Sequence, residues 1–80
     1  MAELESKIQA RIIKRVEGQG YYVVKLILTN KNGIPDLLVL KDGKAFFVEV
    51  KRPGEKPRPL QEYRMNELKE LGFICEVWKE

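Results

Sequence analysis

The chain has 80 residues, a formal net charge of +3 and no histidine. The absence of histidine excludes Cys/His zinc sites and any nucleophile activated by a histidine, and the single cysteine, Cys75, excludes a disulfide within the chain. We expect one small domain, residues 1–80, with a modest core, because a chain of this length buries a limited share of its surface.

Residues 3–17 are predicted to form an amphipathic helix. Its apolar side chains recur at helical spacing and gather on one face. They are Leu4, Ile8, Ile12, Ile13 and Val16. The opposite side is basic, and it is either a solvated face or a contact for nucleic acid. It carries Lys7, Arg11, Lys14 and Arg15.

Glu5 falls near the middle of the apolar face of this helix. A carboxylate in that position conflicts with burial unless it has a partner. Two interpretations stay open. Either Glu5 reaches a functional site as an additional acidic group, or it is solvated in the first turn, where the helix dipole favours a negative charge.

Gly18-Gln19-Gly20 ends the helix, and residues 21–28 are predicted to form a strand because they are rich in aromatic and β-branched residues. A polar loop, residues 29–33, follows. Pro35 comes just before the next strand, where a missing N–H is tolerated. Gly33 either permits a close approach of the backbone near a bound metal and phosphate or belongs to a plain turn.

Residues 36–40 and 45–50 are predicted to form a β-hairpin. The Asp42-Gly43 pair between two apolar runs is a strong hairpin signal. If these two residues form the loop, Lys41 pairs with Lys44, and counting outward from that pair places Asp36 directly opposite Glu49. Because side chains alternate along a strand, Lys51 lies on the same face as Glu49.

Two carboxylates and an ammonium group at the end of an apolar hairpin need an explanation. Opposed like charges destabilise a sheet, and a buried charge needs a partner or a metal. Paired carboxylates suit a hard divalent cation such as Mg²⁺ or Mn²⁺. Asp36, Glu49 and Lys51 therefore indicate metal-dependent cleavage of a phosphodiester. The alternative is an internal salt bridge at the strand end.

The remaining elements are a loop, a helix and a strand. Residues 52–59 contain three prolines and a glycine, which forbid regular structure, so they are predicted to form a loop. This loop either contacts phosphates through its lysine and arginine side chains or is an ordinary solvated connector. Residues 60–71 are predicted to form a helix between Pro59 and Gly72, with an apolar face. That face comprises Leu60, Tyr63, Leu68 and Leu71. Residues 73–78 are predicted to form the last strand.

These motifs resemble the PD-(D/E)xK nuclease superfamily. Pro35-Asp36 is similar to its PD element, and Glu49-Val50-Lys51 is similar to its ExK element. The wider pattern resembles the virus-type replication-repair nuclease (VRR-NUC) family over nearly the whole chain: Gly-Ile-Pro-Asp, then Phe-Val-Glu-Val-Lys-Arg-Pro-Gly, Leu-Gln-Glu-Tyr and Leu-Gly-Phe. The resemblance implies an α/β fold with the restriction-endonuclease-like core, a small mixed β-sheet flanked by helices. The predicted order is helix, three strands, helix, strand.

The resemblance also implies roles for particular residues. Asp36 and Glu49 are expected to bind Mg²⁺ or Mn²⁺, with the carbonyl of Val50 and the carboxylate of Glu5 as further ligands. Lys51 is expected to orient a water molecule or help to deprotonate it.

Relatives often place a glutamine near the site, and Gln61 matches it in the first turn of the second predicted helix. The form QxxY is not kept, since Arg64 stands three residues after Gln61. The role of Gln61 therefore stays open. The expected contacts to nucleic acid are Lys31, Arg52, Lys56 and Arg58.

We therefore expect a structure-selective DNA endonuclease of phage or bacterial replication and repair. Stand-alone members of the family look like homodimers, which would suit branched DNA such as Holliday junctions. Exposed apolar residues in 21–28 or in the last strand are the candidates for the interface. A non-catalytic DNA-binding or assembly module and an RNA-directed nuclease are the alternatives. No signal peptide or membrane span is visible, so a cytoplasmic location in the bacterial host is expected.

Overall fold

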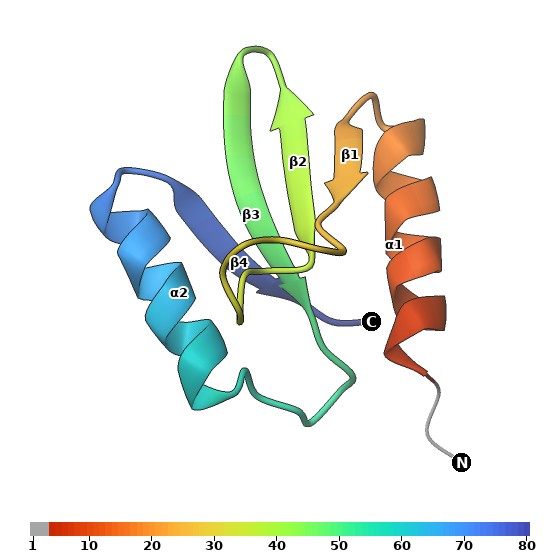
Figure 1. Cartoon of the computed structure of the whole chain (residues 1–80). Helices are drawn as coiled ribbons and strands as arrows, with labels where there is room; N and C mark the ends of the chain where they lie inside the picture. The colour runs from red at the N-terminus through yellow and green to blue at the C-terminus, as the bar shows by residue number, and fades with distance from the viewer. Residues whose placement is uncertain (1–3) are drawn as a thin grey trace.

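A four-stranded mixed sheet is flanked by two helices (Figure 1). The computed structural model describes residues 4–80. The elements, in chain order, are α1 (Glu5–Gly18), β1 (Tyr22–Lys25), β2 (Leu37–Lys41), β3 (Lys44–Val50), α2 (Pro59–Glu70) and β4 (Ile74–Trp78). The strands lie side by side as β1-β2-β3-β4. The first three are antiparallel and β4 runs parallel to β3. The predicted α/β class and element order are confirmed.

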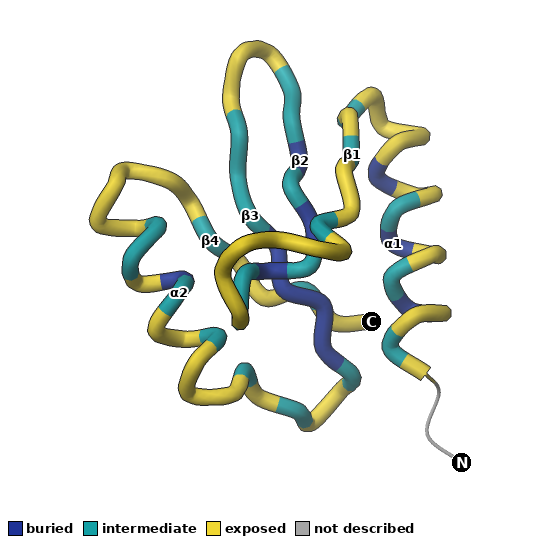
Figure 2. Tube along the Cα trace, in the orientation of Figure 1, coloured by how far each residue is buried: buried dark blue, intermediate teal, exposed yellow. Residues whose placement is uncertain are grey.

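Helix α1 covers one face of the sheet and forms the core with it. Its buried residues, Ile8, Ile12 and Val16, recur at the predicted helical spacing. They pack against the buried apolar residues of β2 and β3, which are Leu37, Val39, Val48 and Val50. Figure 2 shows this buried layer on the inner side of α1 and on the lower part of the hairpin. Within residues 4–80 no helix is long and apolar enough to cross a membrane.

Helix α2 lies on the other face of the sheet, beside β4. Cys75 is paired with Phe47, whose side chain points away from the α1 core because its neighbour Phe46 packs against that core. The thiol of Cys75 lies 3.6 Å from the carbonyl oxygen of Met65 in α2. The two helices therefore cover opposite faces, and α2 covers the β4 side of its face.

The first strand is shorter than predicted. It ends at Lys25, which pairs with Leu37 at the start of β2, and the N–H of Leu26 donates to the carbonyl of Asp36 at 2.8 Å. Beyond this point the partner strand is absent because Pro35 has no N–H to donate. Ile27 and Leu28 consequently leave the sheet and are 83% and 94% exposed.

The apolar face predicted for the second helix does not match the face that is buried. Met65 is the buried residue of α2, Leu68 is half-buried, and three predicted members of the face are exposed. These are Leu60, Tyr63 and Leu71. At about 100° per residue the exposed three lie roughly 120–160° from Met65, on the opposite side of the helix. The packing against β4 decides which side of α2 is covered, and it leaves an apolar strip in solvent.

Candidate active site

The β2–β3 hairpin sets the geometry of the site. Its turn residues Asp42 and Gly43 have φ angles of +53° and +74°, as expected for the two central positions of a type I′ turn. Lys41 pairs with Lys44, and Leu37 pairs with Val48. The predicted register is therefore confirmed, and it places Asp36 across from Glu49.

Each carboxylate of this pair bonds to the backbone of the opposite strand. The N–H of Asp36 donates to Glu49 Oε1 at 3.2 Å, and the N–H of Val50 donates to Asp36 Oδ2 at 2.9 Å. These two bonds replace the ladder beyond Leu37 and Val48, and they hold both carboxylates on the α2 face at the end of the hairpin.

Burial makes the charges of this site costly. Glu49 is 1% exposed and Lys51 is 4% exposed. Lys51 Nζ lies 3.4 Å from Glu49 Oε2. Burial, and then the negative charge of Asp36, raise the pKa of Glu49 from 4.5 to about 7, although the ammonium of Lys51 opposes the change. The site therefore holds more negative charge than Lys51 alone neutralises.

The donor set fits a divalent cation such as Mg²⁺. Two carboxylates and a backbone carbonyl, that of Val50, belong to the same strand ends and are hard oxygen donors. Within residues 4–80 no group of three or more Asp, Glu, His or Cys side chains is placed to hold a metal ion. A site of one or two carboxylates completed by water is nevertheless the usual form for Mg²⁺. The raised pKa of Glu49 also fits a cation site. It shows that negative charge is unfavourable at this position, and a bound cation would favour the ionised form.

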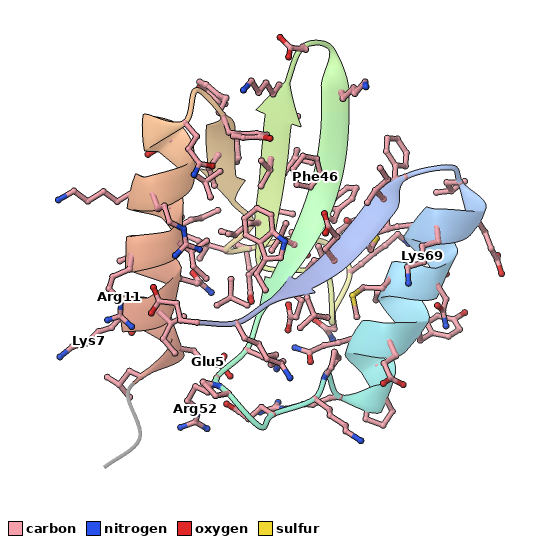
Figure 3. The ribbon with its side chains drawn as sticks, turned by 180° about the vertical axis from the view of Figure 1, so that it is seen from behind. Glu5, Lys7, Arg11, Phe46, Arg52 and Lys69 are labelled. Atoms are coloured by element: carbon pink, nitrogen blue, oxygen red, sulfur yellow. The ribbon has the colours of Figure 1, made fainter. Side chains whose placement is uncertain are left out.

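Glu5 joins the site through Lys51. It begins α1, its side chain is 35% exposed, and its Oε1 lies 4.0 Å from Lys51 Nζ. Lys51 therefore lies between the carboxylates of Glu49 and Glu5 (the latter labelled in Figure 3). The structure places Glu5 at the rim of the site, against the ammonium. Its expected role as a metal ligand stays a prediction that would require Glu5 to turn away from Lys51.

Gln61 has a structural role that the sequence reasoning missed. Its Oε1 accepts a hydrogen bond from the N–H of Arg58 at 2.8 Å, which caps the first turn of α2. The signal was present in the sequence, because glutamine at the third helical position commonly bonds back to the N-cap residue. Any water or phosphate bound through that oxygen would compete with the cap.

The predicted nucleic-acid contacts lie on two loops. Lys31 is exposed on the loop before β2, and Lys56 and Arg58 are exposed on the loop that leaves β3. Arg52 is half-buried and forms an ion pair with Glu55, and this bond raises the pKa of the Arg52 guanidinium. Glu55 is thus a further participant that the sequence reasoning did not single out.

The loop before β2 is fixed to α2. Gly33 has φ +82°, and a Cβ atom added there would lie 2.7 Å from Leu60 Cγ. Arg64 Nε donates to the carbonyl of Asn32 at 2.8 Å. Gly33 lies in a turn with a positive φ, and its close approach is to Leu60 of α2. This docking positions Lys31 relative to the site. An approach to a bound metal or phosphate stays a prediction.

Fold and site together define a class, an α/β domain with two opposed carboxylates and a lysine at the end of a central hairpin. The VRR-NUC domain family matches residues 3–79. A solved structure described as a VRR_NUC domain is similar with a TM-score of 0.80 and 36% identity, over 91% of this chain and 81% of that chain. The chain belongs to the VRR-NUC family.

A phage protein is also similar in sequence. The "Putative nuclease p44" of Acyrthosiphon pisum secondary endosymbiont phage 1 is 41% identical over 58 residues, which are 71% of this chain and 62% of that protein. The match thus spans less than two thirds of the relative's length. It supports the family assignment.

Proposed function

We propose that this protein is a nuclease that hydrolyses phosphodiester bonds of DNA with Mg²⁺ or Mn²⁺. The observation that supports it most strongly is the group formed by the half-buried Asp36 and the buried Glu49 and Lys51, in which the pKa of Glu49 is raised to about 7. Such a group lowers the stability of a small domain, so its presence is best explained by a function. Membership of the VRR-NUC family and the name of the phage relative support the same activity.

Asp36, Glu49 and the carbonyl of Val50 would hold the cation. A bound divalent cation lowers the pKa of water and polarises the phosphate. Lys51, which is held beside Glu49 Oε2, would orient the attacking water, and its positive charge would favour loss of a proton from that water to solvent. Glu5 would keep Lys51 Nζ in place from the opposite side, which their 4.0 Å separation supports. Gln61 would maintain the first turn of α2 and contact a water or phosphate through its amide nitrogen.

DNA is the proposed substrate because the site is bordered by exposed cations. Lys31, Lys56 and Arg58 would contact phosphates, and Arg52 would join them when it exchanges Glu55 for a phosphate. Such contacts position a duplex without reading its sequence. We therefore propose selectivity for DNA shape, with branched DNA such as a Holliday junction as the substrate.

We further propose a homodimer, in which two sites related by a two-fold axis would cut opposed strands. Its support is the apolar surface on the side of the sheet that α2 leaves open. Tyr22 and Val24 are exposed on that face of β1, Ile27 and Leu28 follow on the loop, and Tyr63 is exposed on α2. A second copy burying these side chains would also enlarge a modest core.

The dimer is tested by sedimentation at several protein concentrations. The variant Ile27→Ser/Leu28→Ser should dissociate at concentrations at which the wild type is dimeric. Ile74→Ser, in β4, serves as the comparison because Ile74 is also exposed but lies on the α1 face, as its pairing with Phe46 shows. Dissociation of Ile74→Ser alone would place the interface on the last strand instead. A wild-type monomer at all concentrations would refute the dimer.

The phage relative suggests the setting. We propose that the protein acts in phage or bacterial DNA replication and repair, in the cytoplasm of the bacterial host. Cleavage at branch points is the step that such a pathway would require of a nuclease that selects DNA shape.

The activity is tested with labelled four-way junctions, flaps, single strands and linear duplex, each with Mg²⁺, with Mn²⁺ and with chelator. Asp36→Asn and Lys51→Ala should lose roughly 100-fold or more in rate, as expected when an electrostatic partner of the reacting group is removed. Lys44→Ala, at the far end of the hairpin, should cut like the wild type. The fluorescence of Trp78, the single tryptophan, shows whether each variant is folded.

Three outcomes would overturn parts of the proposal. DNA binding without cleavage and without metal uptake would leave a non-catalytic binding or assembly module. Cleavage of RNA in preference to DNA would make the protein an RNA-directed nuclease, which would need contacts to the 2′-OH. Equal cleavage of all DNA forms would refute the selectivity for branches.

A further inference from the structure

The outer face of α1 carries a stripe of cations that the proposed site does not use. Its members fall within about 100° of one another around the helix and extend over about 12 Å at 1.5 Å per residue. They are Lys7, Arg11, Lys14 and Arg15. Figure 3 shows Lys7 and Arg11 extending outward from α1, while Glu5 points back toward the strand end.

This arrangement lowers the stability of the free helix. Lys7 and Arg11 are four residues apart, as are Arg11 and Arg15, and like charges at this spacing each cost about 0.2–0.5 kcal/mol. Lys7 also lies in the first turn of α1, where the helix dipole disfavours a positive charge. A stripe with this cost and no role in the core is explained if it binds an anionic partner.

Within the described residues 4–80, two of the four cations of the stripe form ion pairs. Glu80 forms ion pairs with Arg11 and Arg15. Lys7 and Lys14 are exposed and form no ion pair with another residue of the described part of the chain, residues 4–80. The positive charge that is available to a partner is therefore concentrated on these two lysines.

The stripe begins at the end of α1 that lies nearest the candidate active site, but it occupies the opposite side of the helix from Glu5. Glu5, two residues before Lys7, lies 4.0 Å from Lys51 Nζ, and its charge also acts on the guanidinium of Arg52. The active site thus lies between two basic surfaces, the loop that follows β3 and the outer face of α1. The apolar surface proposed for the dimer lies on the opposite side of the sheet and leaves α1 accessible.

We propose that the outer face of α1 is a second contact surface for the DNA backbone, with Lys7 and Lys14 binding phosphates of the arm opposite the one held by the 52–58 loop. This inference rests on the proposed function, because it places the substrate of that site. Each strand of a duplex carries one phosphate per about 3.4 Å of the helix axis, so a 12 Å stripe that runs along the duplex spans the length occupied by three to four of them. Two diverging basic surfaces on either side of one site fit a branch point.

The test is the binding of a fluorescent four-way junction, measured by anisotropy with Ca²⁺ in place of Mg²⁺ to prevent cleavage, over a series of KCl concentrations. Lys7→Ala/Lys14→Ala removes two charges and keeps good helix propensity. The matched control, Lys44→Ala/Lys69→Ala, also removes two exposed lysines, at the hairpin turn and on α2. Lys69 lies at the opposite side of the molecule from Lys7 in Figure 3.

The α1 variant should lower the slope of log affinity against log salt by about 2, since each lost phosphate contact removes about 0.9. At 0.1 M salt this corresponds to weaker binding by up to about 60-fold. Lys7→Arg/Lys14→Arg should restore both affinity and slope. The control should match the wild type.

The outcomes separate this inference from the proposed function. If the wild type binds no DNA, the proposed function fails. If the wild type binds but the α1 variant matches the control in affinity and slope, α1 is a solvated face and this inference alone fails. An affinity loss that the arginine variant does not restore would show a structural effect and would also refute it.

Discussion

Glu49 should make the stability of the cation-free protein fall as the pH rises through neutrality. Its pKa in the folded protein is about 7, against 4.5 for an ordinary glutamate, because it is buried and faces Asp36. A raised folded-state pKa means that the folded protein binds the proton more tightly than the unfolded chain does. The stabilisation is therefore complete below pH 4.5 and is lost as the pH rises to 7.

The magnitude follows from the change in pKa. One pKa unit corresponds to about 1.4 kcal/mol, so the full change is worth about 3 kcal/mol. We expect about 2 kcal/mol, because Asp36 is only half-buried and solvent screens part of its interaction with Glu49. The pH window is favourable for measurement, since the chain has no histidine to titrate in it. The assay is urea unfolding in chelator, followed by Trp78 fluorescence, between pH 5 and 8.

Two comparisons isolate the carboxylate. Glu49→Gln, a neutral side chain of the same shape, should lose this decline in stability. Saturating Mg²⁺ should also remove it in the wild type, because the cation competes with the proton, and the apparent Mg²⁺ affinity measured by calorimetry should fall as the pH is lowered below 7. A wild-type stability that is constant or rises over this range, or the same decline in Glu49→Gln, would refute the reasoning.

Three further predictions follow from local geometry. Gly33→Ala should lower the free energy of unfolding by about 2 kcal/mol or more, because the new Cβ is strained at φ +82° and meets a neighbouring side chain at 2.7 Å. Gly54→Ala has the same strain in open space and should cost about half as much in the same urea titration. Ile12→Val, at a position with 0% exposure, should cost about 0.5–1.5 kcal/mol, and a cost near zero would place Ile12 outside the core. Glu55→Gln should tighten DNA binding several-fold in an anisotropy titration, because it removes the carboxylate that pairs with Arg52; unchanged binding would show that Arg52 does not contact phosphate.

The hairpin and its charged end could be predicted from local pattern alone. Asp42 and Gly43 favour a two-residue turn, and a two-residue turn sets the register of both strands. Once that register is known, Asp36 and Glu49 must lie opposite each other, and the structure confirms this arrangement. The geometry of the two carboxylates therefore required no knowledge of distant contacts.

Features that depend on distant contacts could not be predicted in the same way. The end of β1 is determined by where its partner strand begins, so the apolar character of Ile27 and Leu28 indicated a longer strand than the partner can support. Which side of α2 is buried depends on its packing against β4, and this selects Met65. The contact of Gly33 with Leu60 likewise joins segments that are remote in sequence.

The roles of Glu5 and Gln61 show the same division within the site. Position on the helical wheel placed Glu5 near the inner face of α1, but only the packed structure shows that its nearest partner is Lys51. Gln61 follows the N-cap residue of α2 by three positions, and its bond to the backbone of Arg58 is a local effect. This bond could have been predicted from the sequence, but the catalytic motif alone does not indicate it.

The unequal burial of the two faces of the sheet connects stability with function. The core cluster lies on the α1 face, whereas Met65 is the buried residue that α2 contributes to the other face, and the charged site occupies the end of that second face. A face with little apolar burial and an uncompensated carboxylate gains from anything that binds it. A cation at 100 times its Kd would add about 2.7 kcal/mol, and a second copy over the exposed apolar residues would add more. If the proposed function holds, the folded state is expected to be most stable as the cation-bound dimer, which is also the form proposed to cut DNA.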